Sequence, residues 1–88
     1  MACFLISYDL TQPERDYDDL IKAIKAYKTW AHITESFWAV VTMRSAREVR
    51  DDLLQHIDAD DRLVVVRSGT EAAWRETICR PEWLQKHL

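Results

Sequence analysis

Hydrophobic positions along this chain switch between the two-residue period of strands and the longer period of helices. Residues 2–9 are rich in large, β-prone side chains and predict a buried strand, which Pro13 separates from the next element. From Tyr17 to Tyr27, apolar residues recur 3, 4, 7 and 10 positions after the first, which is the spacing of one helical face. This segment is therefore predicted to be an amphipathic helix with Asp16 as its N-cap.

Residues 30–43 form a second apolar stretch, which is long compared with an average strand of about 5–6 residues. We expect two strands with a break near residues 34–36. Since this break holds no Gly, Asn or Pro, one long strand with a bulge is the alternative. Ser45 and Glu48 have the spacing of a capping box, which predicts the start of a second helix. An acidic turn at residues 58–61 ends that helix.

The C-terminal part of the chain begins with a short, strongly apolar strand at residues 62–67. Beyond Gly69 the pattern is helical. Thr70 is expected to be the N-cap of a helical segment that includes Trp74, and Pro81 suits the first turn of a final helix.

The order strand, helix, strand, strand, helix, strand is the ferredoxin-like β-α-β-β-α-β arrangement, in which two helices cover one face of an antiparallel sheet. We therefore predict a single α/β (α+β) domain over residues 1–88, with a core at residues 2–68 and a helical C-terminal extension at residues 70–88. The predicted strands are apolar on both faces, whereas a face in contact with water would be polar. The second face must be covered, either by the C-terminal helices with Trp74 and Trp83 or by a second copy of the chain.

Composition and charge exclude several classes of protein. The 88 residues carry 12 basic and 15 acidic side chains, and the net charge of −3 argues against a protein that coats nucleic acid. The single glycine, Gly69, excludes the glycine-rich loops of dinucleotide-binding folds and P-loops. No apolar run reaches the length of a membrane span, and we expect no signal peptide. Cys3 and Cys79 form neither a disulfide framework nor a zinc motif, which favours a reducing, cytoplasmic setting.

Three segments carry a family resemblance. The predicted first strand ends in Ser7-Tyr8-Asp9, residues 34–38 read Thr-Glu-Ser-Phe-Trp, and an acidic turn leads into an apolar strand over residues 58–67. In this order, the segments resemble the CRISPR-associated protein 2 family and the related virulence-associated protein D ribonucleases, over about residues 3–68. The resemblance implies a ferredoxin-like homodimer.

The resemblance also implies a role for Asp9. In that family the aspartate at the end of the first strand lies near the two-fold axis, where two copies can share a divalent metal for phosphodiester cleavage. Asp9 would then be the catalytic residue and a ligand of Mg²⁺ or Mn²⁺, and one aspartate from each subunit would suffice because Mg²⁺ keeps several waters. Without the resemblance, Asp9 is interpreted as a residue that ends the strand and accepts backbone N–H groups in the loop.

Other side chains could contact nucleic acid. Ser7 and Ser36 could position a phosphate, and Tyr8 could stack on a base, although such residues more often serve local hydrogen bonding and packing. Two basic rows at three-residue spacing could straddle a phosphate backbone, although solvated helix faces have the same pattern. The rows are Lys22, Lys25 and Lys28 on the first helix and Arg44, Arg47 and Arg50 at the second.

Two classes of function are consistent with these observations. The first is a metal-dependent endonuclease that acts on RNA or DNA. The second is a non-catalytic homodimer that binds protein or nucleic acid as a scaffold. Family members often carry arginine or lysine pairs after the aspartate, whereas residues 10–15 supply one arginine, and a helical tail stands where the family has a fifth strand. The acidic net charge and this loop favour the second class slightly, and neither class involves a membrane.

Overall fold

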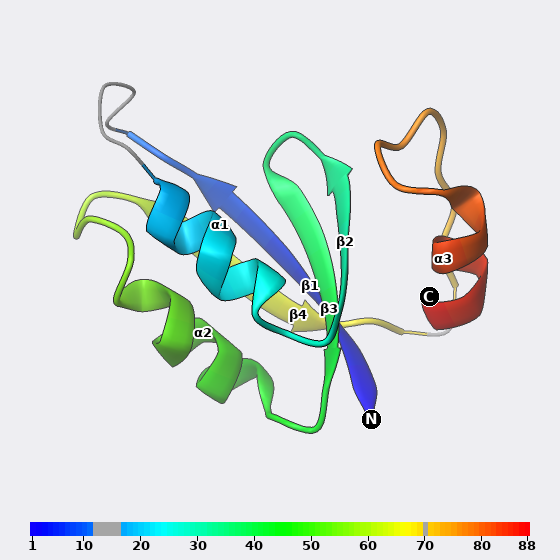
Figure 1. Cartoon of the computed structure of the whole chain (residues 1–88), viewed down its shortest axis with the longest axis horizontal. Helices are drawn as coiled ribbons and strands as arrows, with labels where there is room; N and C mark the ends of the chain where they lie inside the picture. The colour runs from blue at the N-terminus through cyan, green and yellow to red at the C-terminus, as the bar shows by residue number, and fades with distance from the viewer. Residues whose placement is uncertain (12–16, 70) are drawn as a thin grey trace.

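The computed structural model describes residues 1–11, 17–69 and 71–88. Within these residues the chain forms one four-stranded sheet and three helices (Figure 1). The elements in chain order are β1 (Ala2–Asp9), α1 (Asp18–Lys25), β2 (Thr29–Thr34), β3 (Phe37–Thr42), α2 (Ala46–Leu54), β4 (Arg62–Arg67) and α3 (Pro81–His87). The strand order is β2-β3-β1-β4 and every pairing is antiparallel. This topology confirms the predicted ferredoxin-like α+β fold.

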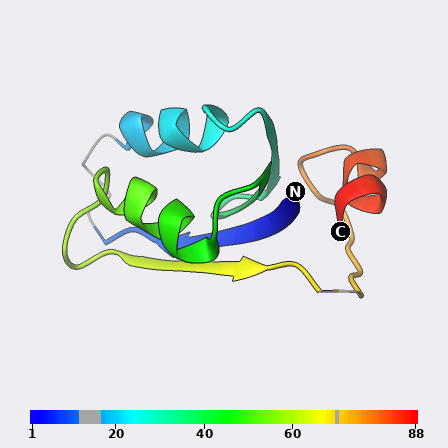
Figure 2. The ribbon, with the colours of Figure 1, turned by 90° about the horizontal axis from the view of Figure 1, so that it is seen from below.

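The helices α1 and α2 lie together on one face of the sheet (Figure 2). The apolar stripe predicted for α1 is buried against the sheet, and its members Leu20 and Ile24 are inaccessible to solvent. The helix is shorter than predicted. It ends at Lys25, two residues before Tyr27. Its N-cap position is held by Tyr17, and Asp16, the predicted N-cap, lies outside the described residues.

The start of α2 confirms the predicted capping box. The backbone N–H of Glu48 donates to Ser45 Oγ at 3.2 Å, and the Glu48 carboxylate accepts the backbone N–H of Ser45 at 3.0 Å. These two bonds satisfy donors that the first turn of a helix otherwise leaves without partners. Val49 and Leu53 then anchor the helix to the sheet. No helix in the described ranges is long and apolar enough to cross a bilayer.

The connection between β2 and β3 contains both features that the sequence suggested. The two strands are separate and are joined by Glu35 and Ser36, as expected from the break near residues 34–36. The register also shifts between His32 and Thr34, so a bulge lies beside the turn. A two-residue hairpin usually requires residues with positive φ, and neither turn residue has one. The bulge bends the strand beside the turn, and this bend allows residues without positive φ to close the hairpin.

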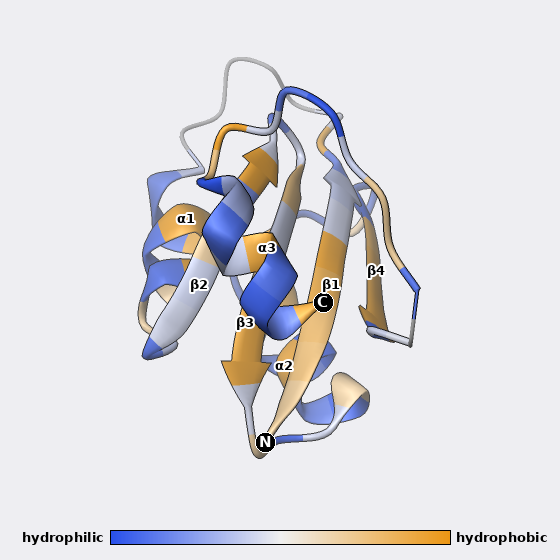
Figure 3. Ribbon diagram, turned by 90° about the vertical axis from the view of Figure 1, so that its right-hand side faces the viewer, coloured by the Kyte–Doolittle hydropathy of each residue, from blue (hydrophilic) through white to orange (hydrophobic). Residues whose placement is uncertain are grey.

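The sheet separates two hydrophobic clusters. The helix-side cluster lies under α1 and α2, and its buried members are Phe4, Ile6, Leu20, Ile24, Trp38, Val40, Val49 and Leu53. The tail-side cluster lies on the opposite face, and its buried members are Cys3, Ala31, Ile33, Ala39 and Leu84. Figure 3 shows α3 lying across this second face. The second apolar face is therefore present as expected, and the C-terminal segment covers part of it.

The predicted helix through Trp74 is wrong, and α3 is the only part of the C-terminal extension that is helical among the described residues. The segment before α3 is irregular, and its residue Glu76 has a φ of 52°, which a right-handed helix does not allow. The backbone N–H of Ile78 instead donates to the carbonyl of Ile33 in β2 at 2.8 Å. Tertiary contacts with the sheet therefore override the local helical pattern. Thr70, the predicted N-cap of that helix, lies outside the described residues.

Along β4, part of the tail-side face stays uncovered. Val64 and Val66 are 56% and 47% exposed. They pair in register with Ser7 and Leu5 of β1, and Leu5 packs against the tail-side cluster. Residues directly opposite in an antiparallel pair share a face, so both valines belong to the tail-side face. We call Val64, Val66 and the half-buried Leu5 the β4 strip.

Candidate functional site

Four of the site residues predicted from the sequence meet at one end of the sheet. Ser7, Tyr8 and Asp9 end β1, and Ser36 lies in the neighbouring β2–β3 turn. The backbone N–H of Tyr8 donates to the Ser36 carbonyl at 3.2 Å, which joins the end of β1 to this turn. Ser7 and Ser36 are exposed and available to solvent. We call this region the Asp9 end of the sheet.

Asp9 forms an ion pair that the sequence did not indicate. Its register partner across β1 and β4 is Arg62, and Arg62 Nη1 donates to Asp9 Oδ2 at 2.9 Å. The two side chains are 65% and 77% exposed, so water screens the pair and its contribution to stability is about 0–1 kcal/mol. The carboxylate therefore accepts a guanidinium N–H, and the alternative in which it accepts backbone N–H groups of the loop has no support in the contacts described.

The two faces of β1 give Asp9 and Tyr8 different surroundings. Ser7 and Asp9 alternate with Tyr8 and therefore share the tail-side face with the β4 strip. Tyr8 points to the helix-side cluster, where its hydroxyl accepts the Trp38 indole N–H at 3.0 Å and lies 3.5 Å from the Glu35 carbonyl. Burial raises the pKa of the Tyr8 hydroxyl, so it stays protonated at neutral pH. This arrangement supports packing as the role of Tyr8 more than stacking on a base.

The acidic turn at residues 58–61 serves the structure next to the Asp9 end. Asp61 accepts the backbone N–H of Thr11 at 2.8 Å, the Tyr17 hydroxyl at 3.0 Å and the backbone N–H of Asp58 at 2.8 Å. One carboxylate therefore ties the segment after β1, the start of α1 and the α2–β4 connection together. The cluster is a turn, as expected, but the prediction that it ends the second helix is wrong, because α2 already ends at Leu54.

Arg44 and Arg47 lie away from Asp9. Thr42, the last residue of β3, pairs with Ala2 at the beginning of β1, whereas Asp9 is the last residue of β1. Arg44 follows Thr42 by two residues, and Arg47 occupies the first turn of α2. Most of the length of β1 therefore separates these two arginines from Asp9.

Several members of the two basic rows already have partners. Arg50 forms two hydrogen bonds with Asp51 Oδ1, at 2.9 and 2.8 Å, on the exposed side of α2. Lys25 Nζ lies 5.2 Å from the ring centroid of Trp30, at the distance of a cation–π contact. Arg47 is exposed to solvent. The rows are thus divided between local pairs and solvated side chains, as the alternative interpretation of the pattern expected.

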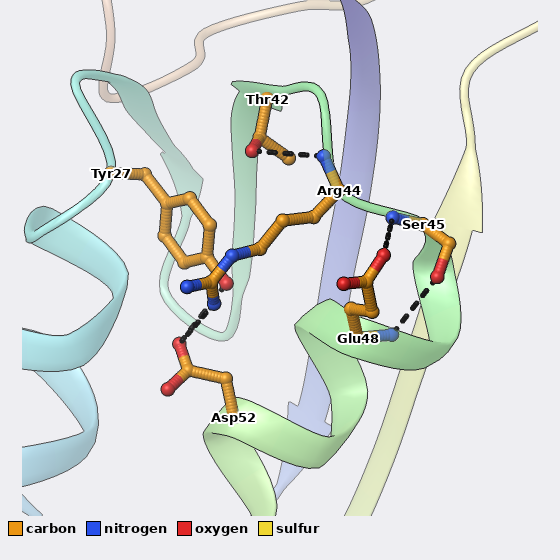
Figure 4. A network of polar contacts seen from close by, with 6 residues as sticks. All are labelled: Tyr27, Thr42, Arg44, Ser45, Glu48 and Asp52. Atoms are coloured by element: carbon orange, nitrogen blue, oxygen red, sulfur yellow. Dashed lines mark hydrogen bonds and ion pairs between the residues drawn. The ribbon is translucent and has the colours of Figure 1, made fainter.

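A polar network surrounds Arg44 (Figure 4). The Tyr27 hydroxyl donates to Asp52 Oδ2 at 3.0 Å, and Arg44 Nη1 lies 3.9 Å from the same oxygen. The Arg44 guanidinium also lies over the Tyr27 ring, with 5.8 Å between Cζ and the ring centroid. Burial and the hydrogen bond to Asp52 raise the pKa of the Tyr27 hydroxyl, which keeps it a donor. The spacing of the arginines in the sequence pointed to Arg44. It did not point to Tyr27, which follows α1, or to Asp52 of α2, because these two residues are far apart in the sequence.

The donors for a metal ion are few within one chain. No group of three or more His, Cys, Asp or Glu side chains among residues 1–11, 17–69 and 71–88 could hold an ion. Asp9 offers one carboxylate, and that carboxylate is paired with Arg62. A Mg²⁺ or Mn²⁺ site would therefore fit only if a second copy brought its own Asp9 and Arg62 released the carboxylate.

Sequence reasoning missed Arg62 and the exposure of the β4 strip. The position of Arg62 opposite Asp9 depends on strand register, which composition and periodicity do not give. The signal for the strip was the apolar second face, but which strand stayed uncovered was not predictable. No protein-family model matches this chain.

Proposed function

We propose that this protein is a homodimeric, non-catalytic module that pairs through β4 and serves as a scaffold for nucleic acid or protein. The observation that carries the proposal is the β4 strip on an edge strand. β4 has β1 as its neighbour on one side, and its other edge has no strand beside it in the described chain. Val64 and Val66 lie exposed along that edge. A regular, valine-rich edge that stays open in water invites pairing with another strand.

A second copy would pair the free backbone groups of β4 and cover its exposed valines. Two β4 strands in antiparallel register would pair their free backbone groups and continue the sheet across a two-fold axis. The same pairing places the exposed valines of one copy beside those of the other on the tail-side face. The resemblance to the CRISPR-associated protein 2 family, in which a ferredoxin-like fold forms homodimers, supports the same conclusion, and it favours nucleic acid as the ligand.

The metal-dependent endonuclease is the second candidate, and one observation favours it. Asp9 lies on the same face as the β4 strip, so two sheets packed face to face over the strips would bring the two Asp9 carboxylates toward each other. Pairing along the β4 edges has the opposite consequence. It leaves two β4 strands between the two β1 strands, and at a strand spacing of about 4.8 Å these are roughly 14 Å apart. The carboxylates could not then share a Mg²⁺ or Mn²⁺ ion.

The oligomeric state tests the shared premise of both candidates. Analytical ultracentrifugation of the wild type is expected to give a dimer, and Val64→Glu is expected to give a folded monomer because it places a charge on the paired strip. Ile78→Glu is the matched control, since Ile78 is an equally exposed aliphatic residue (60%) in the C-terminal segment and should leave the dimer intact. A wild type that is monomeric at about 1 mM, where a contact worth only about 4 kcal/mol would be half formed, contradicts the proposal.

Cross-linking separates the two candidates. Asp9→Cys, with Cys79 replaced by Ser, is expected to form no intermolecular disulfide. Pairing along the β4 edges keeps the two β1 strands roughly 14 Å apart, whereas a disulfide needs Cα atoms within about 7 Å. Rapid and complete cross-linking would instead support face-to-face packing and the shared metal. In that case the wild type, but not Asp9→Asn, should cleave RNA or DNA when Mg²⁺ or Mn²⁺ is added.

A further inference from the structure

A cavity of about 540 Å³ opens at the end of the sheet opposite Asp9. The segment after α1, the end of β3 and the residues before α2 surround it, together with one side chain of α2. Its polar lining includes Tyr27, Lys28, Arg44 and Asp52, which come from three separate parts of the chain. The volume lies within the range of about 300–1,000 Å³ that is typical of sites for small ligands.

Two cations converge on this cavity. Thr29 pairs with Val41 in the β2–β3 register, so Lys28, the residue before it, lies level with the end of β3. Arg44, two residues after that end, reaches back over the ring of Tyr27, the neighbour of Lys28. Lys28 is exposed, and no ion pair holds it within the part of the chain that the structure describes. The cavity therefore presents an ammonium group and a guanidinium group from adjoining segments.

The guanidinium of Arg44 has donors to spare. Its distance to Asp52 Oδ2 is 3.9 Å, which is too long for a hydrogen bond, and the side chain is 53% exposed. The Tyr27 hydroxyl donates to the same Asp52 oxygen at 3.0 Å and so already satisfies part of that carboxylate (Figure 4). An arginine carries five N–H donors in a planar fork that matches the oxygens of a phosphate. Arg44 can therefore accept an anion without breaking a strong bond.

The rest of the cavity fits the body of a ligand more than a bare ion. Ala23 and Ala26 supply an apolar wall, and Thr42, whose side chain lies on the helix side of the sheet, supplies a hydroxyl group near it. The start of α2 is capped by its own serine and glutamate, so an anion here would be held by side chains and not by the free amides of a helix end. A flat, weakly polar group on the apolar wall with a phosphate at the cations uses both parts of the lining.

We propose that this cavity binds a nucleotide, with its phosphate at Lys28 and Arg44 and its base on the alanine wall. The proposal deepens the proposed function by naming the ligand class and site, and it does not depend on the dimer. The nucleotide could be free, or it could be the phosphorylated end of a nucleic-acid strand. Both sources present the same phosphomonoester and base.

Titration with AMP, followed by calorimetry and by amide NMR shifts, tests the site. AMP is expected to bind saturably and to shift the amides of the cavity, whereas adenosine, which lacks the phosphate, should bind at least about tenfold more weakly. Arg44→Gln and Lys28→Gln should each weaken AMP binding by about tenfold, which is the loss expected for one charge-assisted hydrogen bond. Arg47→Gln, three residues further along in the first turn of α2, is the matched control and should change the affinity less than about twofold.

A ten-nucleotide strand with a 5′-phosphate distinguishes the two sources. If it binds more tightly than AMP and loses affinity without its 5′-phosphate, the ligand is a strand end; equal or weaker binding assigns the site to a free nucleotide. Val64→Glu should bind AMP with the affinity of the wild type. The AMP titration therefore tests the cavity, and ultracentrifugation tests the dimer, so that either proposal can fail without the other. Equal binding of AMP and adenosine, absence of saturation, or an Arg47→Gln effect as large as that of Arg44→Gln would overturn the proposal.

Discussion

Leu84→Ala measures how firmly the C-terminal segment is held on the second face of the sheet. Leu84 of α3 is inaccessible to solvent and belongs to the tail-side cluster with Cys3, Ala31, Ile33 and Ala39. Truncating a fully buried leucine to alanine costs about 2–5 kcal/mol, because transfer free energy is lost and a cavity remains. A domain of this size has a total stability of roughly 4–13 kcal/mol. The substitution is therefore expected to remove a large fraction of the stability that holds the segment in place.

The assay combines a global and a local measurement. Urea denaturation followed by circular dichroism reports the free energy of unfolding of the whole domain. Amide hydrogen exchange of Ile78 reports the docking of the segment, because this N–H is bonded to the Ile33 carbonyl at 2.8 Å. At the lower end of the expected range, Leu84→Ala should speed the exchange of Ile78 by about 30-fold, even if the rest of the sheet stays protected.

Leu54→Ala is the matched control for this measurement. Leu54 is 47% exposed on α2, so the same truncation should cost less than about 1 kcal/mol and leave the exchange of Ile78 unchanged. The reasoning is refuted if Leu84→Ala costs no more than Leu54→Ala, because the segment would then contribute nothing to covering the second face. The uncovered area available for pairing would in that case extend well beyond the β4 strip.

Three further predictions concern polar contacts. Asp9→Asn should lower the free energy of unfolding by less than about 1 kcal/mol, and a double-mutant cycle with Arg62→Gln should give a coupling in the same range, because both side chains are largely exposed. The hydrogen bond from the Ser45 backbone lowers the pKa of Glu48 from its ordinary value of 4.5, so its contribution to stability is complete above that value and is lost as the pH falls through the folded-state pKa. Urea midpoints measured from about pH 6 to about pH 3 should therefore fall less steeply in Glu48→Gln than in the wild type. Asp61→Ala should destabilise the domain by about 1–3 kcal/mol, because it leaves donors from three segments without their acceptor, whereas the exposed Asp60→Ala should change the thermal midpoint little.

The family resemblance and the geometry suggest different roles for Asp9. The resemblance makes it a metal ligand, and that role stays a prediction. The ion pair with Arg62 gives Asp9 a partner within its own chain, and the choice between edge pairing and face packing decides whether two copies could share an ion. Cross-linking at position 9 therefore carries more information than an activity assay alone, since it is informative whether or not cleavage is found.

Local patterns in the sequence determined the elements of the core. The spacing of Leu20 and Ile24 predicted α1, and the pair Ser45 and Glu48 predicted the start of α2, because a helical face and a capping box depend only on residues a few positions apart. The same holds for the apolar strands and for the order that gave the ferredoxin-like fold. Local patterns failed before α3, where a backbone bond from Ile78 to Ile33 outweighs a helical preference.

Only the tertiary structure decided what surrounds each candidate residue. Register placed Arg62 against Asp9, and chain folding brought Lys28 and Arg44 to the lining of one cavity, although neither pair is close in the sequence. An alternating strand reveals that two faces are apolar, but not which of them a distant segment will cover. That outcome depends on contacts across the whole chain, and here it left Val64 and Val66 open to solvent.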